Sequence, residues 1–75
     1  GTRASCVFEY LDKHLSDVQD VIIFTDLYLE SDFEKEVDNN NNWDKYNTLW
    51  IRTEGGNKEY TPSFGRTIDL IENVK

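Results

Sequence analysis

The stretch Asp20-Val21-Ile22-Ile23-Phe24-Thr25-Asp26 decides the fold, because it places four apolar residues in unbroken succession before a threonine and an aspartate. A short apolar run rich in β-branched and aromatic residues is typical of a strand covered on both faces, since a strand with one wet face alternates apolar and polar residues. We therefore predict a strand over residues 21–26 in the middle of a parallel sheet. Asp26 then lies at the carboxyl edge of the sheet, where open α/β folds bind ligands and ions.

Length and composition limit the chain to one small domain, residues 1–75, with a formal net charge of −7. This charge argues against nucleic acid and anionic lipid as partners, because both require clustered Lys and Arg. No stretch approaches the ~20 apolar residues of a membrane span. The single cysteine, Cys6, cannot form an internal disulfide, so a cytoplasmic location suits the chain. We expect Cys6 to be a small buried apolar residue rather than a nucleophile.

One main amphipathic helix is predicted over residues 4–15, with Thr2 and Ser5 as candidate N-cap residues. Its apolar residues, which helical spacing places on one face, are Val7, Phe8, Leu11 and Leu15. After Asp26, the stretch Ser31-Asp32-Phe33-Glu34 forms a Ser-x-x-Glu capping box, which predicts one or two helical turns through Val37. The four consecutive Asn residues, 39–42, then predict a solvated loop.

Two further strands complete the predicted sheet. Residues 48–53 are rich in residue types that fit a pleated surface, and residues 67–71 begin with an alternation that suits a sheet edge with one wet face. In the loop between them, Tyr60 and Phe64 are expected to fold back over the core, and Trp50 and Trp43 to lie in it or at its edge. We therefore predict a small α/β fold with a three-stranded, largely parallel, Rossmann-like sheet.

The order of elements predicts an open edge on the first strand. A helix before a buried parallel strand normally belongs to a crossover from an earlier strand, and this sequence begins at the helix. Either an earlier segment lies outside the sequence or one edge of the strand at residues 21–26 is free. Because a free apolar edge invites pairing with another chain, we expect self-association or a protein partner there.

Several short stretches, taken together, resemble the carboxyl-terminal part of a von Willebrand factor A-like domain. They are Gly1-Thr2, Val7-Phe8-Glu9-Tyr10, Phe24-Thr25-Asp26, Leu49-Trp50-Ile51 and Pro62-Ser63-Phe64-Gly65-Arg66-Thr67-Ile68. The version resembled is that of bacterial and phage proteins that carry a provisional metallopeptidase label. The resemblance runs over nearly the whole chain, and the acidic, Asn-rich crossover departs from it.

The resemblance implies a Rossmann-like sheet and a Mg²⁺ site formed by three loops, in which Thr2 would be the second-loop ligand and Asp26 the third-loop aspartate. Mg²⁺ prefers hard oxygen ligands in an octahedron and leaves room for a partner's carboxylate. The first loop of the family, Asp-x-Ser-x-Ser, has no counterpart here, and Leu27 stands where the family tends to have Gly. A Thr hydroxyl and one carboxylate alone predict weak Mg²⁺ binding at most.

Simpler interpretations exist for each candidate residue. Asp26 is also suited to capping the turn after the strand, and Thr2 to capping the helix. The alternating carboxylates of the crossover have two interpretations, a cation site and a solvated acidic segment, and their spacing favours the acidic segment. These carboxylates are Glu30, Asp32, Glu34, Glu36 and Asp38. A peptidase needs a metal-binding motif such as His-Glu-x-x-His, and the chain has only His14, so no residue is assigned to catalysis.

We therefore expect a protein-interaction module, in a metal-assisted or a metal-free form, rather than an enzyme. One alternative is a non-catalytic piece of a metallopeptidase-like protein. The other is a small acidic phage protein that inhibits a host factor by presenting negative surface.

Overall fold

The computed structural model describes residues 3–14, 17, 19–39 and 42–70. Its elements follow the chain as helix α1 (Ala4–His14), strand β1 (Asp20–Thr25), helix α2 (Phe33–Asp38), a 3₁₀ turn η1 (Trp43–Lys45), strand β2 (Asn47–Arg52) and strand β3 (Arg66–Asp69). The strands form one sheet in the order β1-β2-β3, and both neighbouring pairs are parallel. The predicted small α/β fold with a parallel sheet is confirmed.

The predicted boundaries are close to those observed. Each strand begins one residue earlier than predicted, and the last predicted residues of the first helix and third strand, Leu15 and Ile71, lie outside the described part of the chain. The capping box at residues 31–34 is wrong: Asp32 precedes α2 and forms no side-chain capping bond. The Glu34 carboxylate instead accepts hydrogen bonds from the Ser63 N–H and the Tyr60 hydroxyl, which tie α2 to the loop before β3.

The core is a cluster of aromatic rings around Phe8, whose side chain is fully buried on α1. The Phe8 ring centroid lies between 5.4 and 6.4 Å from five other rings, those of Phe33, Trp43, Tyr46, Trp50 and Phe64. Such stacked, tilted and edge-on pairs add about 0.5–1.5 kcal/mol each beyond the area they bury. The cluster therefore joins α1, α2, η1, β2 and the β2–β3 loop in one contact, and the predicted core positions of Trp43 and Trp50 are confirmed.

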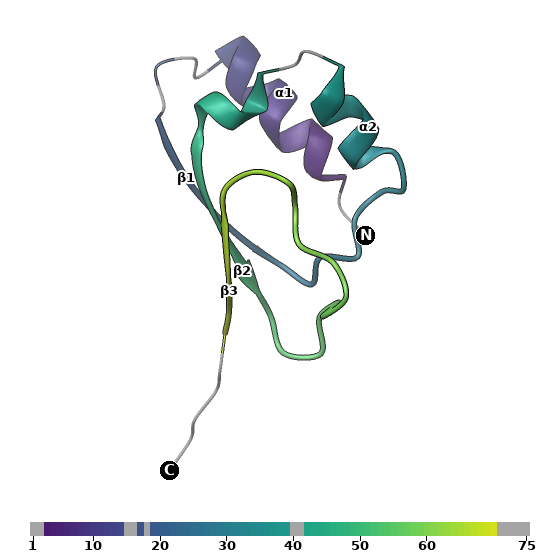
Figure 1. The fold of residues 1–75 in the computed structure, drawn as a ribbon. Helices are drawn as coiled ribbons and strands as arrows, with labels where there is room; N and C mark the ends of the chain where they lie inside the picture. Colours follow the sequence, from purple (N-terminus) through teal and green to yellow (C-terminus); the bar gives the residue numbers. More distant parts are fainter. Residues whose placement is uncertain (1–2, 15–16, 18, 40–41, 71–75) are drawn as a thin grey trace.

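Both helices lie on one side of the sheet (Figure 1). Val21 and Ile23 of β1 pack against the aromatic cluster, whereas Ile22 and Phe24 point the other way and remain 62% and 63% exposed. The prediction that this strand is covered on both faces is therefore wrong. Its predicted place in the middle of the sheet is also wrong, because β1 is an edge strand and β2 is central.

The strand order explains why only one face is covered. Parallel crossovers are nearly always right-handed, so strands that follow one another in chain order across a sheet carry their connections on the same face. The β2–β3 connection contains no helix, yet it too lies on the helix side. Phe64 is buried there, and its carbonyl accepts a hydrogen bond of 3.1 Å from Trp50 Nε1. The expectation that Tyr60 and Phe64 fold back over the core is confirmed.

Gly65 allows this loop to lie flat against β2. It has a φ of 79°, and a Cβ atom there would lie 2.7 Å from the Thr48 carbonyl oxygen, closer than any real side chain permits. The same Cβ atom would lie only 3.0 Å from Nε1 of the Trp50 ring. A side chain at position 65 would therefore lift the loop from the sheet.

Cys6 is exposed on α1, so the expectation that it is buried is wrong. The residues of α1 that face the sheet, Ala4, Phe8 and Leu11, follow the 3.6-residue period, and position 6 falls on the opposite side of the helix. Cys6 is therefore exposed because of its position in the helical repeat, although its side chain is small and apolar.

Replacing the central ring should remove most of the stability of a domain this small. We expect Phe8→Ala to lower the free energy of unfolding by about 3–5 kcal/mol, since it removes all five ring contacts of Phe8 at once. Tyr10→Ala on the exposed side of the same helix is the matched control and should change it by less than about 0.5 kcal/mol. Urea denaturation followed by circular dichroism measures both; similar losses would show that Phe8 is not the centre of the core.

Candidate functional site

The predicted metal position is a tight turn at the carboxyl end of β1. The exposed Asp26 carboxylate accepts the Tyr28 N–H at 3.0 Å, and the Thr25 hydroxyl oxygen accepts the Leu27 N–H at 3.1 Å. The other predicted ligand, Thr2, lies outside the described residues. Only Asp26 of the predicted pair can therefore be placed, and its carboxylate already stabilises the local turn.

Leu27 adopts the left-handed conformation, with a φ of 61°, while its side chain is fully buried. This conformation costs a non-glycine residue roughly 1 kcal/mol, which burial of a leucine side chain offsets. The β2–β3 loop holds the turn in place: Asn57 N–H donates to the Asp26 carbonyl at 2.8 Å, and Gly56 packs so closely that a Cβ there would lie 2.9 Å from the same oxygen.

The surroundings of Asp26 fit a magnesium ion poorly. A cavity of about 410 Å³ beside it is lined mainly by apolar side chains, including Ala4, Val7, Ile23 and Leu29. Mg²⁺ requires an octahedron of hard oxygens, and one carboxylate engaged in a turn supplies little of it. Asp26 alone is therefore an incomplete ligand set for Mg²⁺.

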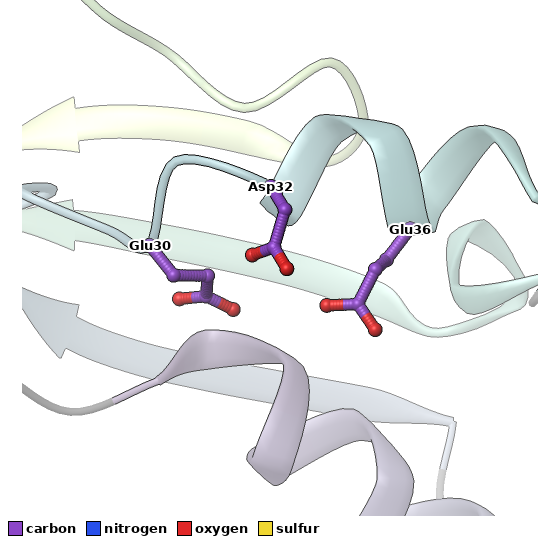
Figure 2. Close-up of side chains that lie close together, drawn as sticks. All are labelled: Glu30, Asp32 and Glu36. Carbon is purple, nitrogen blue, oxygen red and sulfur yellow. The ribbon is translucent and has the colours of Figure 1, made fainter.

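A second acidic group lies near the start of α2. Carboxylate oxygens of Glu30, Asp32 and Glu36 lie within 4.8 Å of one another, and Figure 2 shows the three side chains converging from α2 and the loop before it. This group could hold a cation. Of the five alternating carboxylates in the sequence, Glu34 points instead to the β2–β3 loop, and Asp38 is not part of the group.

All three carboxylates contact residues at the start of α1. The Glu30 oxygens accept the N–H groups of Ala4 and Ser5, each at 2.9 Å, and so satisfy the first helical donors at the positive end of the helix. Arg3 lies 3.4 Å from both Asp32 and Glu36 and supplies the positive charge that a cation would otherwise provide. Ser5 is therefore in the first turn of α1, not its N-cap.

The environment of Glu30 also shifts its acidity. Burial alone would raise the pKa of the Glu30 carboxyl, but hydrogen bonds from the Ser5 and Ala4 N–H groups outweigh it and hold the pKa below its ordinary value. A carboxylate with a depressed folded-state pKa stabilises the fold above its unfolded-state pKa, and this stabilisation is lost as the pH falls through the folded-state pKa.

Removing the Glu30 charge should therefore cost stability in a pH-dependent way. At pH 7 we expect Glu30→Gln to lower the free energy of unfolding by about 1 kcal/mol, as for the loss of a helix cap. The difference should begin to shrink near pH 4, close to the unfolded-state pKa of Glu, and should vanish once the pH has fallen through the lower folded-state pKa. Asp32→Asn, which removes only an exposed ion pair, is the control and should cost less than about 0.5 kcal/mol. A pH-independent difference measured by urea denaturation would contradict this role of Glu30.

The most extensive unexplained feature is the uncovered face of the sheet, which we call the open face. The strand register aligns Ile22 with Leu49 and Arg66, and Phe24 with Ile51 and Ile68. The open face consists of Asp20, Ile22, Phe24, Asn47, Leu49, Ile51, Arg66 and Ile68. Ile51 is only 9% exposed although it is not part of the aromatic core. This is expected for a residue of the central strand, because residues of β1 and β3 flank it on the open face.

Such a face is unusual for a parallel sheet, because parallel strands are normally covered on both sides. Ile22 and Phe24 are each more than half exposed, and Phe24 is level with the partly exposed Ile68 on the far side of β2. With Leu49 and Ile51 between them, these residues form one apolar surface rather than scattered residues. The edge of β1 that faces away from β2 has no strand paired with it among the described residues. An apolar face and a free strand edge are thus continuous with each other.

Comparisons with protein-family models, curated proteins and solved structures find no match to this chain. In the part of the chain that the structure describes, no helix has the length and apolar character needed to cross a membrane. Within that same part, Glu30, Asp32 and Glu36 form the only group of three acidic, His or Cys side chains placed closely enough to hold a metal ion.

The sequence analysis missed the open face because four consecutive apolar residues conceal an alternation. Val21 and Ile23 pack against the core, whereas Ile22 and Phe24 lie on the open face, but all four residues are apolar. The available signal was the small number of helices: one main helix and one short one cannot cover two faces of a sheet.

Proposed function

We propose that this chain is a protein-interaction module that binds its partner through the open face and the adjacent free edge of β1. The observation that carries the proposal is the pair Ile22 and Phe24, which are exposed side by side on a parallel sheet. Burying these side chains would gain about 25 cal/mol for each Å² of apolar surface removed from water. No catalytic activity is proposed for these residues.

The von Willebrand A-like resemblance stays part of this proposal. Members of that family present a Rossmann-like sheet, and a metal-assisted form of the module would use Mg²⁺ at the rim near Thr2 and Asp26. Because Asp26 is the one described ligand of that site and its carboxylate caps a turn, we propose that binding through the open face does not depend on Mg²⁺.

The acidic inhibitor is the second candidate, and the carboxylates around α2 favour it. They lie on the helix side of the domain, away from the open face, so the two candidates use opposite surfaces. Attraction between exposed charges weakens as salt shortens the Debye length, whereas apolar burial does not. Salt dependence therefore separates the two candidates.

A charge placed on the open face should abolish partner binding without unfolding the domain. We expect an immobilised wild-type chain to capture its partner, either a free copy of the same chain or a protein from a bacterial extract. Phe24→Glu should lose that capture, because Phe24 is 63% exposed and its replacement leaves the core intact. Tyr10→Glu, an exposed aromatic on α1, is the matched control and should retain it. Capture that is equal for all three chains, or that disappears in 0.5 M salt as an acidic surface requires, would contradict the proposal.

Magnesium should bind weakly. We expect calorimetric titration of the chain with Mg²⁺ to give no affinity tighter than the millimolar range, as for a site with too few protein oxygens. Two variants distinguish the candidate metal positions: Glu36→Gln changes the acidic group at α2, and Asp26→Ala changes the rim at the end of β1. Micromolar affinity that is lost in Asp26→Ala alone would show that the rim is a true metal site and that the metal-assisted form is correct.

A further inference from the structure

We propose that the partner of the open face is a second copy of this chain, packed face to face about a two-fold axis parallel to β2. This inference rests on the proposed function, since it names the occupant of the same surface. It is carried by the position of two opposite charges, Asp20 and Arg66, at the amino end of that face.

Asp20 and Arg66 stand on opposite edges of the sheet. Asp20 is the first residue of β1 and Arg66 the first of β3, with β2 between them. Asn47 of β2 holds the Asp20 carboxylate on the open face with a hydrogen bond of 3.0 Å. Arg66 is exposed and forms no ion pair with any residue that the structure describes. The face therefore presents an oriented acid on one edge and an exposed base on the other.

A two-fold axis parallel to the strands brings these charges together across the interface. Such a rotation keeps the strand direction and places β1 of one copy over β3 of the other. Asp20 then lies near Arg66 of the second copy, and the symmetry repeats the pair on the other edge. Arg66 lies level with Ile22, two residues beyond Asp20, a step of roughly 6.6 Å that an arginine side chain spans.

The apolar residues match under the same rotation. Phe24 of β1 would lie over Ile68 on β3 of the second copy, and Ile22 over the aliphatic part of its Arg66. The β2 strands would meet along the axis through Leu49 and Ile51. A shallow hollow of about 400 Å³ lies at the amino end, lined by Asp20, Ile22, Leu49 and Arg66 among others. It offers room for the aliphatic part of the second copy's arginine side chain.

The other two-fold arrangement is electrostatically worse. An axis across the strands would place β1 over β1 in opposite directions and bring Asp20 toward the exposed Asp26 of the second copy. Like charges placed opposite each other disfavour association. The charge pattern therefore selects the axis parallel to β2.

The net charge of −7 does not oppose this contact. The open face carries one acid and one base, while much of the acidic excess lies on α1, α2 and the segment before α2: Glu9, Asp12, Glu30, Asp32, Glu34, Glu36 and Asp38. The sheet lies between these residues and the interface. A layer of this kind is about 10 Å thick, comparable with the Debye length at physiological salt, so repulsion between the two helix layers is weakened.

The size of the face predicts a weak dimer. Three strands about 4.8 Å apart and at most six residues long at about 3.3 Å each give a surface of roughly 15 by 20 Å. This is well below the ~800 Å² per partner of a stable interface. We therefore expect reversible, concentration-dependent association with a dissociation constant in the micromolar to millimolar range.

Charge reversal tests the arrangement by sedimentation equilibrium from about 10 μM to 1 mM, the range suited to an interface this small. We expect the wild type to dimerise, and Asp20→Lys and Arg66→Glu each to weaken dimerisation by about tenfold or more, since each places like charges opposite each other twice. An equimolar mixture of the two single variants should form a heterodimer, because both pairs then regain opposite charges. The double variant should also dimerise.

Matched controls on α1 carry the same changes of net charge. Glu9→Lys and Lys13→Glu are exposed and far from the open face, and they should leave dimerisation unchanged within about twofold. Circular dichroism confirms that each variant is folded.

Three results would overturn the inference. The first is a wild-type chain that stays monomeric to 1 mM. If Phe24→Glu still loses capture of another protein in that case, the open face binds a different partner and the proposed function stands. The second is dimerisation that Arg66→Glu leaves unchanged, which would indicate pairing along the β1 edge, far from β3. The third is failure of the mixed single variants to associate, which would exclude the Asp20–Arg66 contact.

Discussion

The fold depends on the aromatic cluster around Phe8, and the cluster lies on one side of the sheet only. Six rings from the two helices, η1, β2 and the β2–β3 loop meet there. A chain this short has few large residues to distribute, and most of them are used in this one contact. Little is left to cover the second face, so β1 and β2 keep apolar residues there that contact no helix. The exposed surface is thus a consequence of how the core is built.

The polar contacts around the core have the same one-sided arrangement. Glu30 joins the loop after β1 to the start of α1, Glu34 joins α2 to the β2–β3 loop, and Asp12 of α1 accepts a hydrogen bond from the Tyr46 hydroxyl just before β2. Burial, together with that Asp12 carboxylate, raises the pKa of Tyr46 to about 12, so the hydroxyl stays protonated and keeps donating. These contacts hold the helix layer on the sheet. The carboxylates therefore have a structural role that does not require a ligand.

Much of the fold could be predicted from the sequence. The 3.6-residue period located α1, and the β-branched runs located the strands and their parallel arrangement. The place of β1 in the sheet and its coverage could not be predicted, because Val21, Ile22, Ile23 and Phe24 are all apolar whichever face they serve. Strand order depends on contacts distant in the chain, which no local pattern contains. The rim residue Asp26 was correctly placed at the end of β1, whereas the open face emerges only when the register aligns three strands.

The central claim is that one face of this parallel sheet is uncovered, and cysteine reactivity measures it most directly. In a Cys6→Ser background, Ile22→Cys introduces a thiol on the open face, and Thr48→Cys introduces one on the helix side at a position that is 2% exposed. With both chains dilute and folded, the account predicts that the thiol at position 22 reacts with a maleimide nearly as fast as a free peptide, and the thiol at position 48 at least tenfold more slowly. Equal protection of the two positions would contradict it.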